Sequence, residues 1–143
     1  MDFDVVPLTA EDFSDAYALW QSSEGVVLQS EERHLHVFVN FLARNPKMSF
    51  GARRAGRLIG AVLAGHDGRR GYIYHLAVTA DCLHQGIGKT LVANVEREMT
   101  RQGVWKAHAH VVTRNLRAQF FWKKIGWSER DDIAKFSHLL FSG

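Results

Sequence analysis

Two glycines, Gly86 and Gly88, are the residues of this sequence best suited to bind a charged ligand. They follow the apolar run from Ile73 to Val78 and directly precede a helical apolar pattern, so the spacing predicts a strand, a loop and a helix start. Glycine has no side chain to obstruct a ligand, and a helix start offers unpaired N–H groups and partial positive charge. The sequence therefore predicts an anion site here, with phosphate the obvious candidate. The alternative explanation of the two glycines is that they allow the strand and the helix to pack closely together.

The glycine loop lacks the third glycine of a dinucleotide fingerprint, and it has no Gly-Lys-Thr at the spacing of a nucleotide-triphosphate loop. It resembles the pyrophosphate loop of the GNAT acetyltransferases, in which Gln or Arg is followed by two residues, Gly, one residue, and Gly or Ala. The segment Val111 to Asn115, followed by Ala118 and then by Gly126-Trp127, is similar to that family's Val-x-x-x-Asn-x-x-Ala segment and closing aromatic helix. The resemblance covers most of the chain.

This resemblance implies a site for acetyl-CoA. In the family the fourth strand lends backbone groups to the pantetheine arm, and the loop and helix start hold the pyrophosphate. The chain departs from the pattern at Leu83, where Gln or Arg is usual, and at Trp122, where the family often has a Tyr proposed to protonate the leaving thiolate. The residues implied to bind the cosubstrate are Leu76, Ala77, Val78, Leu83, His84, Gln85, Gly86, Ile87, Gly88, Lys89, Thr90, Asn115 and Trp122.

Transfer of an acetyl group to an amine needs a base, because a free ammonium cannot attack. His75, on the predicted cofactor strand, is the leading candidate, and Tyr74 and Tyr72 are the alternatives. Strict alternation along a strand places His75 with Ile73 and Ala77, opposite both tyrosines. A structural, hydrogen-bonded histidine is the competing interpretation of His75.

His108 and His110 are two residues apart on the next predicted strand and so point the same way, which is compatible with metal ligation. Two ligands do not make a site, and we predict no metal; the pair is expected to line the second face of the sheet. Cys82 is the only cysteine, which excludes an internal disulfide and favours a small loop residue over a nucleophile.

The resemblance also implies where the acceptor binds: the loop Ser22 to Gly25 and the segment Glu129 to Asp132, whose acidic residues suit a cationic amine. Trp20, Trp122 and Trp127 are candidates for an aromatic wall. Aromatic residues at helical spacing are more often part of the core.

The periodicity predicts one α/β domain over residues 1–143, with a central mixed sheet flanked by helices, in the order β-α-α-β-β-β-α-β-α-β. This order resembles the GNAT topology, which implies that the sheet is mostly antiparallel. The Asp67-Gly68 turn between two apolar runs is a strong hairpin signal. The predicted strands are Phe3 to Pro7, Met48 to Ala52, Leu58 to Ala64, Gly71 to Thr79, Val104 to Val112 and Ile133 to Phe141. The predicted helices follow Thr9, Ser30 and the glycine loop, and a fourth contains Ala118 to Ile125.

The composition, with 143 residues and 46% hydrophobic content, supports one buried core. The net charge is +3 and the cations are scattered, which does not indicate nucleic acid binding. No stretch reaches the roughly 20 apolar residues of a membrane span, and the N-terminus lacks the form of a secretory signal. A cytoplasmic protein is the default expectation.

The leading hypothesis is an acetyl-CoA-dependent N-acetyltransferase that acts directly on a primary amine of a small molecule or a protein. The alternatives are a non-catalytic CoA- or peptide-binding domain of the same fold and a plain interaction module without a cofactor. The expected partners are acetyl-CoA and an amine acceptor. We expect no binding to nucleic acid or to a membrane, and a homodimer is possible.

Overall fold

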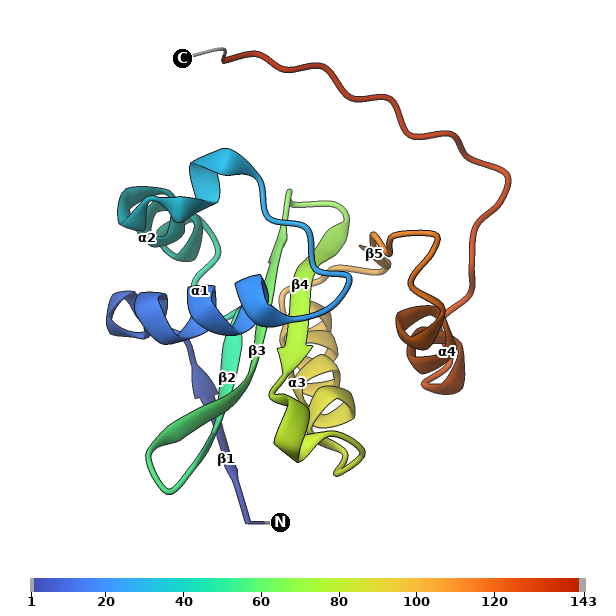
Figure 1. The fold of residues 1–143 in the computed structure, drawn as a ribbon. Helices are drawn as coiled ribbons and strands as arrows, with labels where there is room; N and C mark the ends of the chain where they lie inside the picture. The colour runs from blue at the N-terminus through green and yellow to red at the C-terminus, as the bar shows by residue number, and fades with distance from the viewer. Residues whose placement is uncertain (1, 142–143) are drawn as a thin grey trace.

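Five strands form one sheet in the computed structural model, which describes residues 2–141 (Figure 1). Neighbouring strands are antiparallel from β1 to β4, whereas β4 and β5 are parallel, so the predicted mixed, mostly antiparallel sheet is confirmed. The strands lie in chain order across the sheet: β1 (Asp4–Pro7), β2 (Phe50–Arg54), β3 (Arg57–His66), β4 (Gly71–Val78) and β5 (Ala107–Ala109).

Helices cover both faces of the sheet. On one face α1 (Phe13–Ser22) packs on β3 and β4 beside α2 (Leu35–Arg44), and α3 (Ile87–Arg101) covers the other face (Figure 1). The buried side of α1 holds Trp20, whose Nε1–H donates to the carbonyl of Ala61 at 3.2 Å, so this tryptophan belongs to the core. A fourth helix, α4 (Leu116–Lys124), lies near β5.

The predicted second helix is divided in two. A 3-10 turn, η2 (Ser30–Arg33), is followed by His34 in an extended conformation, and α2 begins only at Leu35. The carboxylate of Glu32 accepts from the N–H of Gln29 at 2.7 Å and also reaches His75 of β4. Because η2 is tied to the sheet in this way, the chain turns there before the longer helix starts.

The predicted final strand, Ile133 to Phe141, is wrong: these residues form no strand with any part of the described chain, and their apolar side chains are exposed. The strand expected from Val104 to Val112 is present but is reduced to Ala107–Ala109. Alternating apolar residues indicate that a segment is stabilised by burial. They do not show that another strand is available to pair with its backbone. Only the first three residues of β4 offer β5 such a partner.

A β-bulge in β4 also changes which side chains share a face. Leu63 pairs with His75 and Ala64 with Ile73, which leaves Tyr74 as the extra residue. Ile73 consequently packs in the core on the α3 side, whereas His75 contacts Trp20 on the α1 side. Tyr74 contacts Phe41 of α2 at a ring distance of 5.6 Å and so lies on the same side as His75. The prediction from strict alternation, that His75 shares a face with Ile73 and lies on the opposite face from Tyr74, is therefore wrong at this point.

Candidate active site

The glycine loop lies between β4 and α3, after a short 3-10 turn, η3 (Ala80–Cys82). Gly86 caps α3 with a φ of +81°, in the left-handed region that favours glycine. A Cβ built on Gly86 would meet no atom within 4 Å, so the loop backbone is open to a ligand. The first-turn N–H groups of α3 have no acceptor inside the helix. The loop thus has the form that a phosphate-bearing ligand requires.

Arg54 of β2 supports this loop through side-chain contacts. The sequence did not predict it as a site residue. Its Nη2 donates to Oε1 of Gln85 and to Oδ1 of Asp2, both at 2.8 Å, and its Nη1 lies 3.5 Å from Sγ of Cys82. Cys82 is buried, as expected for a small structural residue. Nothing in the linear sequence pairs Arg54 with Gln85, because 31 positions separate them.

β4 and β5 separate on the side of the sheet that is nearer the loop. The two strands pair only through Gly71–Ile73 and Ala107–Ala109, although β4 continues to Val78 with β3 on its other side. The edge of β4 that faces β5 therefore has no strand partner from Tyr74 to Val78 within the described chain. Leu76, Ala77 and Val78 lie on this stretch, where backbone groups suit an extended ligand that runs along the strand.

The second half of the site is built around α4. Oδ1 of Asn115 accepts from the N–H of Ala118 at 3.1 Å and so caps the helix. A Cβ on Gly25, whose φ is +81°, would lie 1.8 Å from Nδ2 of Asn115, so only glycine allows this approach. The predicted acceptor loop, Ser22 to Gly25, therefore contacts a residue predicted to bind the cosubstrate.

Trp122 lies on α4 and is half-buried. Its ring centroid lies 4.6 Å from that of Trp127 and 5.3 Å from that of Phe121. Phe121 in turn packs near the loop, since a Cβ on Gly88 would lie 3.2 Å from Cε1 of Phe121. The aromatic residues of α4 thus support the second loop glycine. Trp20, in the core on the opposite face, does not join them.

His75 is 8% exposed and its Nε2 lies 2.6 Å from Oε1 of Glu32, while its ring contacts Trp20 at 5.4 Å. Burial alone would raise the pKa of Glu32, but hydrogen bonds from His75 and from the Gln29 N–H outweigh it, so this pKa is below its ordinary value. Glu32 is therefore a carboxylate at neutral pH. This geometry favours the structural interpretation of His75 over its use as a base.

A cluster of four rings stands at the point where β4 and β5 separate. Tyr72 contacts Tyr74 at 6.0 Å, His108 at 5.7 Å and His110 at 6.4 Å between ring centroids. Both histidines thus point to the same face, as their spacing predicts. Within residues 2–141 no group of three or more His, Cys, Asp or Glu side chains is arranged to hold a metal.

The two histidines of this cluster have lowered pKa values. Burial lowers the pKa of His108, and the charges of Lys106, Arg130 and Arg70 add to the effect. Burial likewise lowers the pKa of His110, with help from Lys135. Both imidazoles are therefore neutral near pH 7 and able to accept a proton. Burial raises the pKa of Tyr74, which keeps that phenol protonated.

Sequence comparison identifies the family. The model of the acetyltransferase (GNAT) family matches residues 11–127, most of the chain. The chain belongs to the GNAT acetyltransferase family. An acetyltransferase of Sodalis glossinidius is 24% identical over 123 residues, which cover 86% of this chain and 85% of the relative.

Solved GNAT structures share the fold. An aminoglycoside acetyltransferase from an uncultured soil sample, in complex with sisomicin, has a TM-score of 0.77 at 17% identity and covers 98% of this chain and 97% of its own. The PaiA N-acetyltransferase of Thermoplasma acidophilum, in complex with coenzyme A, has a TM-score of 0.76 at 20% identity, with 92% of both chains covered. No helix in residues 2–141 has the length and apolar character to cross a membrane.

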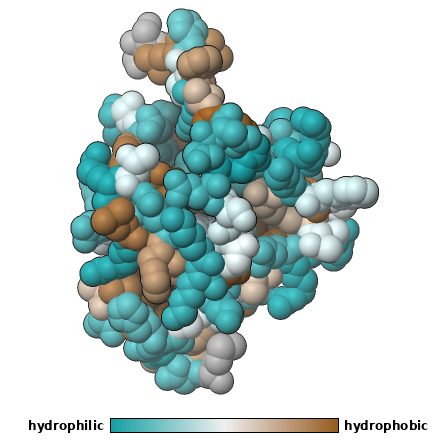
Figure 2. Space-filling view, turned by 90° about the vertical axis from the view of Figure 1, so that its right-hand side faces the viewer, coloured by the Kyte–Doolittle hydropathy of each residue, from teal (hydrophilic) through white to brown (hydrophobic). Residues whose placement is uncertain are grey.

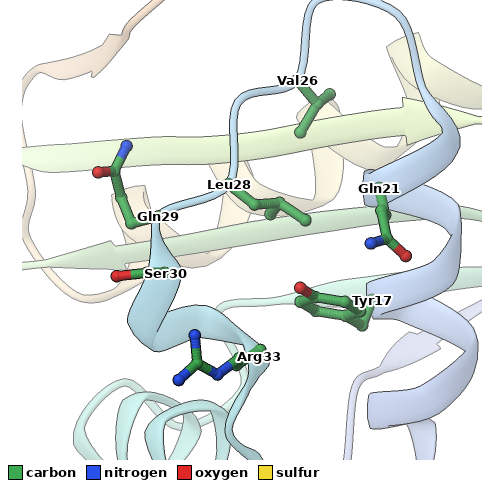
Figure 3. Close-up of a pocket in the computed structure, with 7 residues that line it drawn as sticks. All are labelled: Tyr17, Gln21, Val26, Leu28, Gln29, Ser30 and Arg33. Atoms are coloured by element: carbon green, nitrogen blue, oxygen red, sulfur yellow. The ribbon is translucent and has the colours of Figure 1, made fainter.

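The GNAT chain also has a hollow of about 300 Å³ beside its predicted acceptor loop (Figure 3). Tyr17 and Gln21 line it from α1, and the other lining residues come from the segment between α1 and α2. Its only charged lining residue is Arg33, so the hollow does not attract an ammonium group. The lining residues are Tyr17, Gln21, Val26, Leu28, Gln29, Ser30 and Arg33.

The acidic segment Glu129 to Asp132 is partly neutralised. Glu129 pairs with Lys123 at 3.0 Å, and Asp132 pairs with Arg130 at 2.9 Å, which lowers the pKa of Asp132 to about 2. These carboxylates are exposed and already have cationic partners. They therefore offer a cationic acceptor less attraction than their number in the sequence implies.

Proposed function

We propose that this protein is an acetyl-CoA-dependent N-acetyltransferase that passes the acetyl group directly to a primary amine of a small molecule or a protein. The observation that carries the proposal is the edge of β4 without a strand partner, from Tyr74 to Val78, which ends beside the Gly86-capped start of α3. Phosphate groups fit the helix start, and the thioester arm fits the free edge along Leu76 to Val78. The coenzyme A complex of a GNAT relative with the same fold supports this assignment.

The proposed reaction takes place where β4 and β5 separate. The amine nitrogen attacks the thioester carbonyl, the C–N bond forms, the C–S bond breaks, and CoA leaves as a thiolate. The amine must first be neutral, and the proton that its nitrogen loses goes to water or to a neighbouring base. We assign this role to His110, next to β5, whose pKa is lowered and whose ring lies 6.4 Å from that of Tyr72, while holding both substrates together supplies much of the rate.

For the acceptor, we propose that the hollow between α1 and η2 takes a polar, uncharged part of the molecule. Gln21, Gln29 and Ser30 offer hydrogen bonds there, and Arg33 repels an ammonium. A GNAT relative with the same fold binds sisomicin, which supports a small-molecule amine. We place the protein in the cytoplasm.

Calorimetry with acetyl-CoA, followed by detection of released thiol with a panel of primary amines, tests the proposal. We expect micromolar binding and amine-dependent thiol release. Absence of acetyl-CoA binding would overturn the assignment. Binding without release for any amine would instead support the second candidate, a non-catalytic CoA-binding domain, which Trp122 at the usual Tyr position favours.

A further inference from the structure

A second hollow, of about 440 Å³, lies at the end of the sheet where the turn between β3 and β4 meets the loop from α3 to β5. Three of the side chains that line it are cationic and none is acidic. None of these three cations forms an ion pair with a carboxylate within residues 2–141. Trp105 is 94% exposed and adds little wall, so positive charge is the main feature of the hollow. The lining residues are Gly68, Arg69, Arg70, Gly103, Trp105 and Lys106.

Asp67, in the turn between β3 and β4, offsets one of these charges. Its Oδ1 accepts from the backbone N–H groups of Arg69 and Arg70, both at 2.8 Å. These hydrogen bonds lower the pKa of Asp67, and the charge of Arg69 adds to the effect. Asp132, the other carboxylate near Lys106, already has a cationic partner at 2.9 Å. The charges of Arg70 and Lys106 are therefore available to a ligand.

Arg70 and Lys106 directly precede the two strands that separate at the proposed reaction point. The residues that follow them, Gly71 and Ala107, are paired, and the N–H of Gly71 donates to the carbonyl of Lys106 at 2.9 Å. Alternation along the strands puts both cationic side chains on the face of His108. Burial lowers the pKa of His108, and the charges of Lys106 and Arg70 lower it further, so both cations lie near its ring.

The electric field at the ring cluster is positive. Burial lowers the pKa values of His108 and His110, and the Lys and Arg side chains that add to these shifts are Lys106, Arg130, Arg70 and Lys135. A positive field repels an ammonium group, but it also lowers the pKa of an amine bound there and so favours the neutral nucleophile. An acceptor that carries a negative group as well is attracted overall. Hydrophilic residues make up most of the side of the molecule that carries α4 (Figure 2), which suits recognition by charge.

We infer that the acceptor carries an anionic group, a carboxylate or a phosphate, and that Arg70 and Lys106 bind this group. The inference rests on the proposed acetyl transfer and names the class of its acceptor. The strands stop pairing after Ile73 and Ala109, three residues beyond the two cations, so the anionic group lies about 10 Å from the reacting amine. The phosphates of acetyl-CoA do not compete for this place, because their proposed cradle follows Val78, about 20 Å away beyond the other end of β4.

Matched peptides test the inference. Gly-Gly-Gly-Glu amide and Gly-Gly-Gly-Gln amide have the same reactive amine, and in the extended form the fourth residue lies about 10 Å from it. At low ionic strength we expect kcat/KM for acetylation to be at least tenfold higher for the Glu peptide. A phosphoserine peptide, compared with its serine counterpart, shows whether phosphate or carboxylate is the better anion. Equal kcat/KM values for charged and uncharged peptides, or a preference for the uncharged ones, overturn the inference.

Two double variants test the residues. Arg70→Gln, Lys106→Gln should bring the kcat/KM values of the Glu and Gln peptides within about twofold of each other. Arg97→Gln, Lys124→Gln removes the same charge from exposed positions on α3 and α4, and it should keep the tenfold preference. Loss of the preference in both variants would indicate an effect of net charge alone. That result, or an unchanged preference in both variants, overturns the assignment of Arg70 and Lys106.

Calorimetry of the peptides without acetyl-CoA separates this inference from the proposed function. The wild-type protein should bind the Glu peptide at least tenfold more tightly than the Gln peptide, and Arg70→Gln, Lys106→Gln should bind both equally. Such discrimination without acetylation of any amine would refute acetyl transfer and retain the anion site. Acetylation of amines without discrimination, either in kcat/KM or in binding, would refute the anion site alone.

Discussion

Nε2 of His75 lies 2.6 Å from Oε1 of Glu32, which joins strand β4 to the turn η2. The pair is mostly shielded from solvent, with side-chain exposures of 8% for His75 and 21% for Glu32. The same carboxylate accepts from the N–H of Gln29. This contact therefore positions the segment between α1 and α2, which forms one wall of the proposed acceptor hollow.

Glu32→Gln should lower the free energy of unfolding by about 1.5 kcal/mol at pH 7, the low end for a hydrogen bond to a charged group. Because the folded pKa of Glu32 is below its ordinary value of 4.5, the stabilisation is present above pH 4.5 and is lost as the pH falls through the folded pKa. Thermal unfolding of both proteins from pH 7 to pH 3 should show the difference shrinking. Glu31→Gln serves as the control. A constant difference down to pH 3 would mean that the charge of Glu32 is not what stabilises the turn.

Gly86→Ala should weaken acetyl-CoA binding at least tenfold, because the left-handed cap of α3 becomes strained and a methyl group enters the space open to the ligand. Gly56→Ala is the matched control, since Gly56 has a φ of +80° and equally open surroundings in the turn between β2 and β3. Both variants should lose similar stability in thermal melts. Calorimetry should show lower affinity for Gly86→Ala alone, and equal affinities in the two variants would place the phosphate cradle elsewhere.

Leu83→Arg should change acetyl-CoA affinity by less than tenfold. Leu83 is half-buried in an extended conformation, so we expect its backbone and not its side chain to contribute to the loop. Calorimetry with the wild-type protein alongside gives the comparison. A tenfold or greater change, about 1.4 kcal/mol, would show that the side chain at this position matters to the site.

Arg54→Met should weaken acetyl-CoA binding several-fold without unfolding the protein, because it removes the support of Gln85 while keeping an apolar stem under the loop. Arg57→Met, which breaks only the exposed pair with Asp81, is the control. Calorimetry should separate the two variants. Equal affinities would mean that the loop keeps its shape without Arg54.

Local patterns predicted the parts of this fold that depend on local chemistry. The Asp67-Gly68 turn forms because Oδ1 of Asp67 accepts from the N–H groups of Arg69 and Arg70, both at 2.8 Å. The start of α3 is likewise set locally, by Gly86 in its left-handed conformation. These features need no knowledge of distant segments.

Long-range pairing accounts for what the sequence did not predict. The bulge at Tyr74 is visible only when β4 is set against β3, and it moves His75 to the face of Trp20. The support of Gln85 by Arg54 joins residues far apart in the chain. The segment Ile133 to Phe141 has apolar side chains on both parities, and a strand there depends on a backbone partner that the described chain does not supply.

Trp122 is the departure from the family pattern with the most direct bearing on mechanism. An indole N–H can donate a hydrogen bond but cannot practically release its proton, so Trp122 is not a general acid. A thiolate is a stable leaving group, since the reference pKa of a cysteine thiol is about 8.5, and protonation need not accompany C–S cleavage. Packing against Trp127 and Phe121 is therefore the role we assign to Trp122, with proton return from water or another residue.

Trp122→Phe should keep most of the saturated turnover with a reactive amine, and any loss should appear mainly as weaker acetyl-CoA binding. Trp122→Ala should also lose about 2 to 3 kcal/mol of stability, less than a fully buried Trp would, because the ring is half-buried. The decisive measurement is turnover of Trp122→Phe as a function of pH, with Trp105→Phe, at a position 94% exposed, as the control. A hundredfold fall with unchanged acetyl-CoA affinity would show that the indole N–H acts in the transition state, because packing alone does not distinguish the transition state from the bound substrate.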